Sequence, residues 1–179
     1  MYCGTNKTAC SSQACISGAM LRLMRVKPYN EISVSELCKE AGVSRQTFYS
    51  LFESRDNVVS FILRSHHCYE PVPEDEHPSC MRQLCHQYSQ YIVDQSDFIR
   101  LLVQNNIIYM LGDSLRETLD GCECFLSGMD PRRRGYASDF IAGGFMSIAS
   151  NYIRDGARAD VAELDDICLE LFGGSIFGL

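Results

Sequence analysis

The chain has 179 residues, of which 46% are hydrophobic and 22% are charged, a balance that is typical of globular domains and excludes disordered and fibrous classes. The longest apolar runs, such as residues 140–146, are short and contain glycines, so we expect no membrane-spanning segment. The N-terminal residues contain no continuous apolar stretch of the kind found in secretory signals, and we therefore expect a cytoplasmic protein.

Charge is divided unevenly along the chain. Residues 1–65 carry eight Lys and Arg against five Asp and Glu, whereas residues 66–179 carry eight against eighteen. The net charges of +3 and −10 sum to the −7 of the whole chain. This asymmetry indicates two halves with different partners, because a basic first third can approach a polyanion that the acidic remainder repels.

Ten cysteines are scattered along the chain, without the spacing of a small secreted disulfide scaffold. Cys15, Cys38 and Cys168 fall among apolar positions of predicted helices, where a reduced thiol behaves as a small hydrophobic side chain. We therefore expect reduced cysteines and a reducing compartment.

Helical periodicity begins near the N-terminus. Apolar residues recur at helical intervals over residues 14–24, and Pro28 ends this predicted helix because proline disfavours helical backbone in the residue before it. Ser33, with Glu36 three residues later, predicts a capping box at the start of a second helix. Gly42 predicts its end, since glycine adopts the left-handed conformation without steric cost.

Two more helices complete the predicted first domain. Ser44 is expected to cap a short third helix and Ser54 a fourth. After them, residues 66–78 hold three of the five prolines and four acidic residues, which is typical of a linker. We therefore predict one domain over residues 1–65 and a second over residues 66–179.

Five predicted helices follow the linker. Pro78 opens the first, Asp97 opens the second, and residues 108–126 form a long third with three-four apolar spacing. The last two span residues 131–155, after the cap and first-turn proline Asp130-Pro131, and residues 160–172. No strand pattern occurs, so the predicted fold is all-α, a helix-turn-helix domain followed by a helical body.

Gly143 and Gly144 interrupt an otherwise strong helix. Each costs about 1 kcal/mol relative to alanine. Close approach of another helix is the expected compensation, although two glycines can also loosen or kink a helix.

Residues 33–52 have the spacing of a helix-turn-helix, with a turn at residues 41–43. Arginine and glutamine can hydrogen-bond to base edges in the major groove, and hydroxyl groups can bind phosphates. The spacing alone also fits an ordinary helical hairpin with a polar face. The residues expected to point outward from its second helix are Arg45, Gln46, Thr47, Tyr49 and Ser50.

Residues 32–63, ISVSELCKEAGVSRQTFYSLFESRDNVVSFIL, closely resemble the DNA-binding signature of the TetR family of transcriptional regulators, especially in the run AGVSRQTFYSLFESRDNV from Ala41 to Val58. Residues 27–32 resemble that family's entry to the motif, and residues 140–156 resemble its penultimate helix. The resemblance implies a DNA-binding regulator, favours a repressor over an activator, and implies no enzymatic activity.

The resemblance also assigns contacts within the second helix of the motif. It implies that Arg45 and Gln46 contact base edges, while Thr47 and Tyr49 hold the phosphate backbone. Leu51 departs from the histidine often found at its position, so it is expected either to touch a thymine methyl group or to pack.

Further backbone contacts are implied outside that helix. Ser33 and Ser35 occupy positions where the preceding helix meets the DNA backbone. Arg55 stands where lysine is more common, so a phosphate contact is expected there.

A homodimer is expected because two recognition helices about 34–36 Å apart can read a two-fold operator. The apolar stripes of residues 131–155 and 160–172 suit a four-helix interface between two copies, although they also suit the core of one copy. The Gly143-Gly144 pair is expected to lie in that interface.

The resemblance further implies a small-molecule effector of unknown identity, bound among the central helices, that moves the fourth helix. No other cofactor is expected. Aromatic and methionine residues at helical spacing are also common in plain cores. The candidate pocket residues are Tyr88, Tyr91, Met110, Leu115, Phe125 and Phe145.

A cluster of histidines and cysteines leaves a second hypothesis open. Imidazole and thiolate groups are ligands of zinc and copper, but the spacings match no standard zinc motif, so we expect no bound metal. The weakest alternative is an enzyme with a cysteine nucleophile near His86, because the chain has no phosphate-binding loop or hydrolase motif. A metal-responsive regulator would use His66, His67, Cys68, His77 and Cys80.

Overall fold

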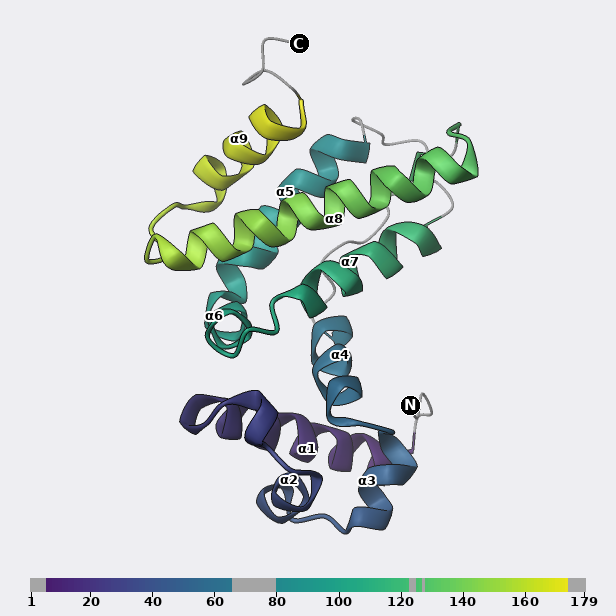
Figure 1. Cartoon of the computed structure of the whole chain (residues 1–179), viewed down its shortest axis with the longest axis vertical. Helices are drawn as coiled ribbons and strands as arrows, with labels where there is room; N and C mark the ends of the chain where they lie inside the picture. The colour runs from purple at the N-terminus through teal and green to yellow at the C-terminus, as the bar shows by residue number, and fades with distance from the viewer. Residues whose placement is uncertain (1–5, 66–79, 123–124, 127, 174–179) are drawn as a thin grey trace. The chain divides into compact units, whose positions relative to one another are not determined.

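A computed structural model describes residues 6–65, 80–122, 125–126 and 128–173. All regular structure in these residues is helical, which confirms the predicted all-α class. The chain divides into two compact units, Met1–His66 and His67–Leu179. Helices α1 to α4 belong to the first unit and helices α5 to α9 to the second (Figure 1).

The first helix of the first unit, α1, spans Lys7–Val26 and is longer than the apolar pattern predicted. It begins where the Asn6 side chain accepts a hydrogen bond from the Thr8 N–H at 2.9 Å. This start was missed because the first two turns carry few apolar residues. The apolar stripe itself is confirmed, with Ile16 and Met20 fully buried.

The other elements of the first unit are short. A 3-10 turn, η1, spans Tyr29–Glu31, and α2, α3 and α4 span Val34–Ala41, Arg45–Leu51 and Arg55–Ser65. Helix α1 packs against all three of these helices. The core between them is fully buried and contains Ile16, Ala19, Met20, Ile32, Leu37, Phe48, Phe52, Val58 and Val59.

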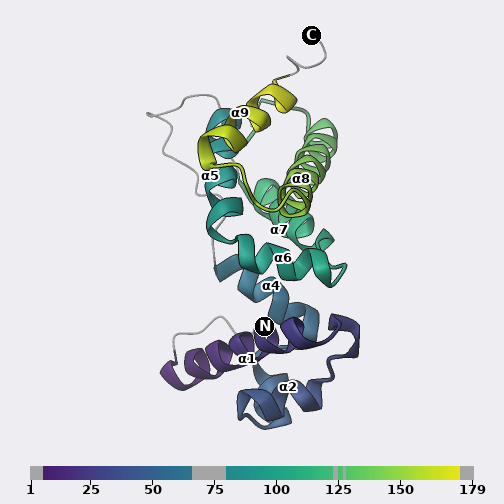
Figure 2. The same ribbon diagram turned by 90° about the vertical axis from the view of Figure 1, so that its left-hand side faces the viewer.

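The second unit contains five helices arranged largely in two pairs. They are α5 (Cys80–Asp94), α6 (Ser96–Gln104), α7 (Tyr109–Gly121), α8 (Pro131–Arg154) and α9 (Val161–Phe172). Helix α7 packs along α8, and α9 packs along α5, so that the two pairs lie beside each other in Figure 2. Helix α6 contacts both α5 and α8.

The predicted extent of α7 is wrong, because the helix ends at Gly121 and not at Leu126. Cys122 is already extended, and the Arg134 guanidinium of α8 donates hydrogen bonds to the carbonyls of Leu119, at 3.1 Å, and of Cys122. The same carbonyls also accept backbone N–H groups, Leu119 from Cys122 and Cys122 from Phe125, each at 3.3 Å. The arginine adds a tertiary contact at this end of the helix, which sequence periodicity cannot reveal.

The predicted caps of α8 and α9 are confirmed. Asp130 accepts hydrogen bonds from the N–H groups of Arg132 and Arg133, with Pro131 in the first turn of α8. Asp160 accepts the N–H of Glu163 at 2.9 Å. These caps satisfy N–H groups that have no partner within the helix.

The two glycines of α8 have different surroundings. A Cβ atom added to Gly144 would lie 2.8 Å from the Cζ of Phe172, whereas one added to Gly143 would meet nothing within 4 Å. The Phe172 ring also stacks on Phe145, with centroids 4.6 Å apart. Close approach is therefore confirmed for Gly144, but the approaching group comes from α9 of the same chain. The expectation that both glycines face a second copy is corrected at Gly144.

Cysteine positions agree with the sequence analysis in two of three cases. Cys38 and Cys168 are buried, as expected, but Cys15 is exposed. Cys15 precedes the buried Ile16 on α1 and lies on the outward side of that helix.

No helix within the described residues is both long and apolar enough to cross a membrane.

Candidate nucleic-acid interface

A tight glycine turn joins α2 to α3. Gly42 has a φ of +67°, in the left-handed region, and its N–H donates to the Lys39 carbonyl at 3.3 Å. The next N–H, of Val43, donates to the Cys38 carbonyl at 3.0 Å. This pair of bonds is the Schellman pattern that ends a helix and turns the chain. It fixes how α3 leaves α2, and it confirms the predicted turn.

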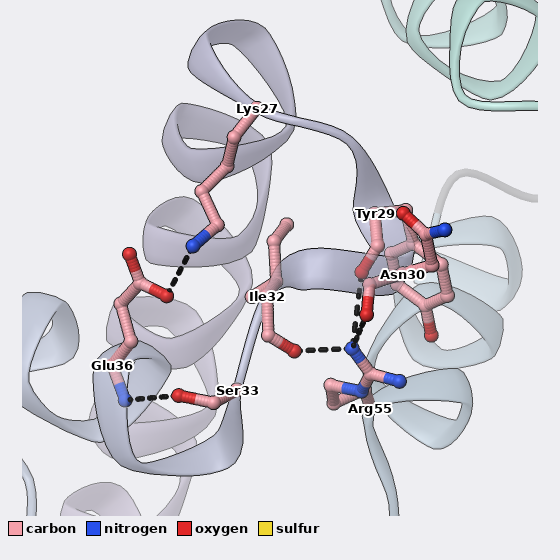
Figure 3. Close-up of polar contacts among 7 residues, drawn as sticks. All are labelled: Lys27, Tyr29, Asn30, Ile32, Ser33, Glu36 and Arg55. Atoms are coloured by element: carbon pink, nitrogen blue, oxygen red, sulfur yellow. Dashed lines mark hydrogen bonds and ion pairs between the residues drawn. The ribbon is translucent and has the colours of Figure 1, made fainter.

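Helix α2 starts at a serine cap, as predicted, but the capping box is only half formed. The Ser33 hydroxyl accepts the Glu36 N–H at 3.1 Å. The Glu36 carboxylate accepts a hydrogen bond from the Lys27 ammonium at 2.6 Å, so it pairs with the end of α1 (Figure 3). That hydrogen bond is the main reason that the pKa of Glu36 lies below its ordinary value.

Helix α3 has an apolar inner face and a polar outer face. Phe48 and Leu51 are buried, with exposed fractions of 0% and 5%. Tyr49 is 51% exposed, and its ring packs edge-on against Phe48 with centroids 5.3 Å apart. The residues on the outer face are Arg45, Gln46, Tyr49 and Ser50, all exposed, with Thr47 half-buried beside them.

The hydroxyl groups of this segment have local partners. Ser44 caps α3 by accepting the Thr47 N–H at 3.0 Å, and the two side-chain oxygens of these residues lie 2.8 Å apart. The Ser50 hydroxyl donates to the Thr47 carbonyl at 2.8 Å. On α2, Ser33 is the cap, and Ser35 is exposed in the first turn.

Leu51 is not available for a contact with DNA. It lies one helical turn after Phe48 on the same inner face and is 5% exposed. The suggested contact with a thymine methyl group is therefore wrong, and the alternative, that Leu51 packs, is correct.

The Arg55 side chain is also directed into its own domain. Its Nη1 atom donates hydrogen bonds to the carbonyl oxygens of Tyr29, at 3.0 Å, Asn30, at 3.4 Å, and Ile32 (Figure 3). The guanidinium carbon lies 5.1 Å from the centroid of the Tyr29 ring. All three bonds use Nη1, and the expected phosphate contact of Arg55 stays a prediction.

All six candidate effector residues are buried in the second unit. The rings of Tyr88 and Phe145 are 4.4 Å apart, and those of Tyr88 and Tyr91 are 5.7 Å apart. Met110 and Leu115 lie on α7, and Phe125 follows it.

A groove of about 560 Å³ lies instead between α8 and α9 and involves none of these six. The groove is lined by Ile148, Asn151, Tyr152, Asp155, Arg158, Ala159, Glu163, Leu164, Ile167 and Leu171.

The alternative metal cluster falls largely outside the described residues. His66, His67, Cys68 and His77 are not described, and neither is the side chain of Cys80. In the part of the chain that is described, no three His, Cys, Asp or Glu side chains are grouped as metal ligands would be. The metal-responsive alternative has no support there. His86 pairs with Asp165, its Nδ1 3.3 Å from the carboxylate Oδ2.

Comparison with known proteins points to one family. Residues 16–60 match the sequence profile described as bacterial regulatory proteins, tetR family. The dhaKLM operon transcriptional activator DhaS of Lactococcus lactis is 34% identical over 59 residues, which are 33% of this chain and 32% of that protein. The transcriptional regulator EthR of Mycolicibacterium smegmatis is 45% identical over 47 residues, 26% of this chain and 22% of that protein.

These sequence matches therefore span at most about a third of the curated relatives. The fold match extends further. The crystal structure of a TetR transcriptional regulator from Streptococcus agalactiae aligns with 93% of this chain and 96% of its own, with a TM-score of 0.59 and 15% identity. The overall arrangement of helices is thus shared well beyond the region of sequence similarity.

Proposed function

Because residues 16–60 match the profile of the tetR family of bacterial regulatory proteins, we propose that the chain is a transcriptional regulator of this family that binds operator DNA through α2 and α3. The outer face of α3 is the observation that carries this proposal. It is polar and exposed, while the inner face is held in the core by Phe48 and Leu51. A short helix presented in this way can enter the major groove.

The side chains of that face divide into two kinds of contact. Arg45 and Gln46 reach base edges, since arginine pairs with guanine and glutamine with adenine in the major groove. Tyr49 and Ser50 bind phosphates by donating their hydroxyl hydrogens, and for Ser50 this bond replaces the one to the Thr47 carbonyl. Thr47 adds a contact to the DNA backbone by donating its hydroxyl hydrogen to a phosphate, while the Ser44 hydroxyl donates in the bond between the two side chains.

Helix α2 supplies its contacts from its first turn. Ser33 and Ser35 lie there, and the N–H groups of that turn carry the positive end of the helix dipole. Both features favour a phosphate oxygen. The net charge of +3 over residues 1–65 supports this approach to DNA, whereas the −10 of the remainder opposes it.

The working unit is a homodimer formed through α8 and α9. Large apolar side chains on these helices are exposed, notably Phe140 at 71%, Tyr136 at 67% and Ile167 at 38%. The α8–α9 groove adds further apolar surface, from residues such as the half-buried Leu171. Apolar area of this extent favours association in water, and a second copy would bring a second α3 to a two-fold operator.

The regulator acts as a repressor that a small-molecule effector releases, and it works in the cytoplasm, where the DNA is. The effector site stays a prediction, because Tyr88, Tyr91 and Phe145 pack on one another and none of them lines the groove between α8 and α9. The relative DhaS is named an activator. A reporter gene placed behind the operator therefore distinguishes repression from activation. Expression that rises when the regulator gene is deleted would support repression.

A binding titration tests the central proposal. Duplexes selected from random sequence by the purified protein are labelled, and anisotropy is followed on the best duplex and on a scrambled one at fixed salt. Replacing Arg45 and Gln46 with alanine should each cost about 1–3 kcal/mol on the selected duplex, with little change on the scrambled one. Arg132→Ala, which removes an exposed positive charge from α8, should change neither.

Undiminished binding of the selected duplex after loss of both Arg45 and Gln46 would contradict the proposal, because another surface would then be reading the sequence. Failure to select any preferred duplex would contradict it as well.

A further inference from the structure

Arg55 is the first residue of α4, yet its guanidinium lies over the turn that precedes α2 (Figure 3). One nitrogen, Nη1, donates hydrogen bonds to the carbonyl oxygens of Tyr29, Asn30 and Ile32. An arginine bonded to neutral carbonyls contributes more than a neutral donor does, because its charge strengthens each bond. The side chain thus joins two segments that are separated by more than twenty residues in the sequence.

The carbonyls involved belong to the entrance of the helix-turn-helix. The η1 turn is closed by the Ile32 N–H, which donates to the Tyr29 carbonyl at 3.1 Å. The next residue, Ser33, is the cap of α2. A shift of the turn would therefore move the cap, and with it the start of α2.

A neighbouring contact strengthens the same junction. The Tyr29 hydroxyl donates a hydrogen bond to the Asp56 carboxylate, in the first turn of α4. Arg55 also covers the face of the Tyr29 ring, at a separation suited to a cation–π contact. Two successive residues of α4 thus hold Tyr29, one by its carbonyl and ring and the other by its hydroxyl.

The opposite side of the α2 start is held independently. Lys27, just after α1, pairs with Glu36 at 2.6 Å. With α1 fixing one side and α4 the other, the orientation of α2 depends on both helices. Because the Gly42 turn then sets α3 relative to α2, displacement at Arg55 is transmitted to the outer face of α3.

We propose that Arg55 is a positioning residue that sets the orientation of α2 and α3 through the Tyr29–Ile32 turn, and that it is not a phosphate ligand. This inference rests on the proposed DNA-binding function. A phosphate ligand contributes equally on every sequence, and its loss lowers the slope of log affinity against log salt by about one per contact. A positioning residue contributes chiefly where base edges must be aligned.

The test compares Arg55→Met with a matched control, Arg64→Met, which removes an exposed positive charge from the last turn of the same helix. Each variant is titrated against the selected and scrambled duplexes at several salt concentrations, with affinities corrected for the folded fraction from urea unfolding. Arg55→Met should weaken the selected duplex at least tenfold and the scrambled one less than threefold, with an unchanged salt slope. The control should leave the ratio of the two affinities unchanged.

Two further variants check the route of the effect. Arg55→Lys should restore most of the lost preference, because an ammonium can donate to the same carbonyls. Tyr29→Phe, which removes the hydroxyl that bonds Asp56 and keeps the ring and the carbonyl, should show the same pattern at smaller size. Equal losses on both duplexes with a salt slope lowered by about one per head would overturn the proposal in favour of a phosphate contact. An unchanged affinity ratio would reduce Arg55 to a purely stabilising role and would also overturn it.

A measurement without DNA separates this inference from the proposed function. Amide hydrogen exchange of the free protein should quicken over residues 33–37 in Arg55→Met, while the buried centre of α1 around Met20 stays protected. Unchanged exchange over residues 33–37 would refute the positioning role even if the wild-type protein binds operator DNA. A wild-type protein without sequence preference would refute only the function.

Discussion

Ser44 is the last residue before α3, and its hydroxyl makes two contacts with Thr47. One is the cap, from the Thr47 N–H at 3.0 Å, and the other joins the two side-chain oxygens at 2.8 Å. The first satisfies a backbone donor that has no partner in the helix. The second joins two hydroxyl groups near the surface, which could hydrogen-bond to water instead.

We therefore expect Ser44→Ala to destabilise the protein by about 0.5–2 kcal/mol. Thr47→Ala keeps the cap and should cost less, in line with a surface substitution of at most about 0.5 kcal/mol. Urea unfolding of both variants measures the difference. Equal losses would show that the contact between the side chains, and not the backbone cap, stabilises the start of α3.

Residue roles could be predicted where they follow from helical periodicity. The outer face of α3 could be predicted in this way, and so could the burial of Leu51, which is one turn after Phe48. The role of Arg55 could not be predicted, because its partners are backbone carbonyls that any sequence would provide. A basic residue at the start of a helix gives no indication of whether it faces DNA or its own chain.

At the scale of whole elements, local sequence patterns predict that a helix exists more accurately than they predict where it ends. Serine and aspartate caps and the Gly42 turn marked most boundaries correctly, because each acts through neighbours three or four residues away. The apolar spacing continues past the true end of α7, where Arg134, more than ten residues later in the chain, bonds the Leu119 and Cys122 carbonyls. Boundaries set by tertiary contacts are invisible to local patterns.

The glycine pair of α8 offers a matched experiment on helix packing. At Gly144 an added methyl group would collide with the Phe172 ring, which is itself packed on Phe145. Gly144→Ala should therefore destabilise the protein by about 1–3 kcal/mol, as overpacking does. Gly143 faces open space, so Gly143→Ala should be neutral or stabilise by up to about 1 kcal/mol through helix propensity.

Thermal or urea unfolding of the two variants decides the matter. Similar gains in stability in both variants would mean that Phe172 does not lie against Gly144. A loss at Gly143 comparable to that at Gly144 would instead indicate that a second copy approaches the helix there, and its dependence on protein concentration would identify that cause.

At the scale of the whole molecule, α8 and α9 expose several large apolar side chains. Phe140 contacts Phe172 edge-on, with centroids 6.3 Å apart, yet the Phe140 side chain remains 71% exposed. Ile167 is exposed at the α8–α9 groove. Sequence periodicity predicts that both helices are amphipathic. It does not tell which of their apolar residues are buried in the core of the chain and which are exposed on its surface.

If this surface joins two copies, the free protein should sediment near 40 kDa at micromolar concentration, about twice its 20.2 kDa. Phe140→Glu and Ile167→Glu should each shift the species towards the monomer, because a carboxylate would be buried without a partner in the interface. Tyr109→Glu is the control, since Tyr109 is a half-exposed aromatic residue of α7, which is not one of the two proposed interface helices. Circular dichroism confirms that each variant is folded.

The monomeric variants also connect assembly to recognition. A single α3 reads too few base pairs for tight binding, so loss of the dimer should weaken a two-fold operator far more than a scrambled duplex, whose binding depends mainly on charge. The Tyr109→Glu control should keep both affinities. A stable 20 kDa wild-type species that still binds a palindromic operator tightly would contradict the dimer, and it would require α2 and α3 of one copy to supply the whole of the specificity.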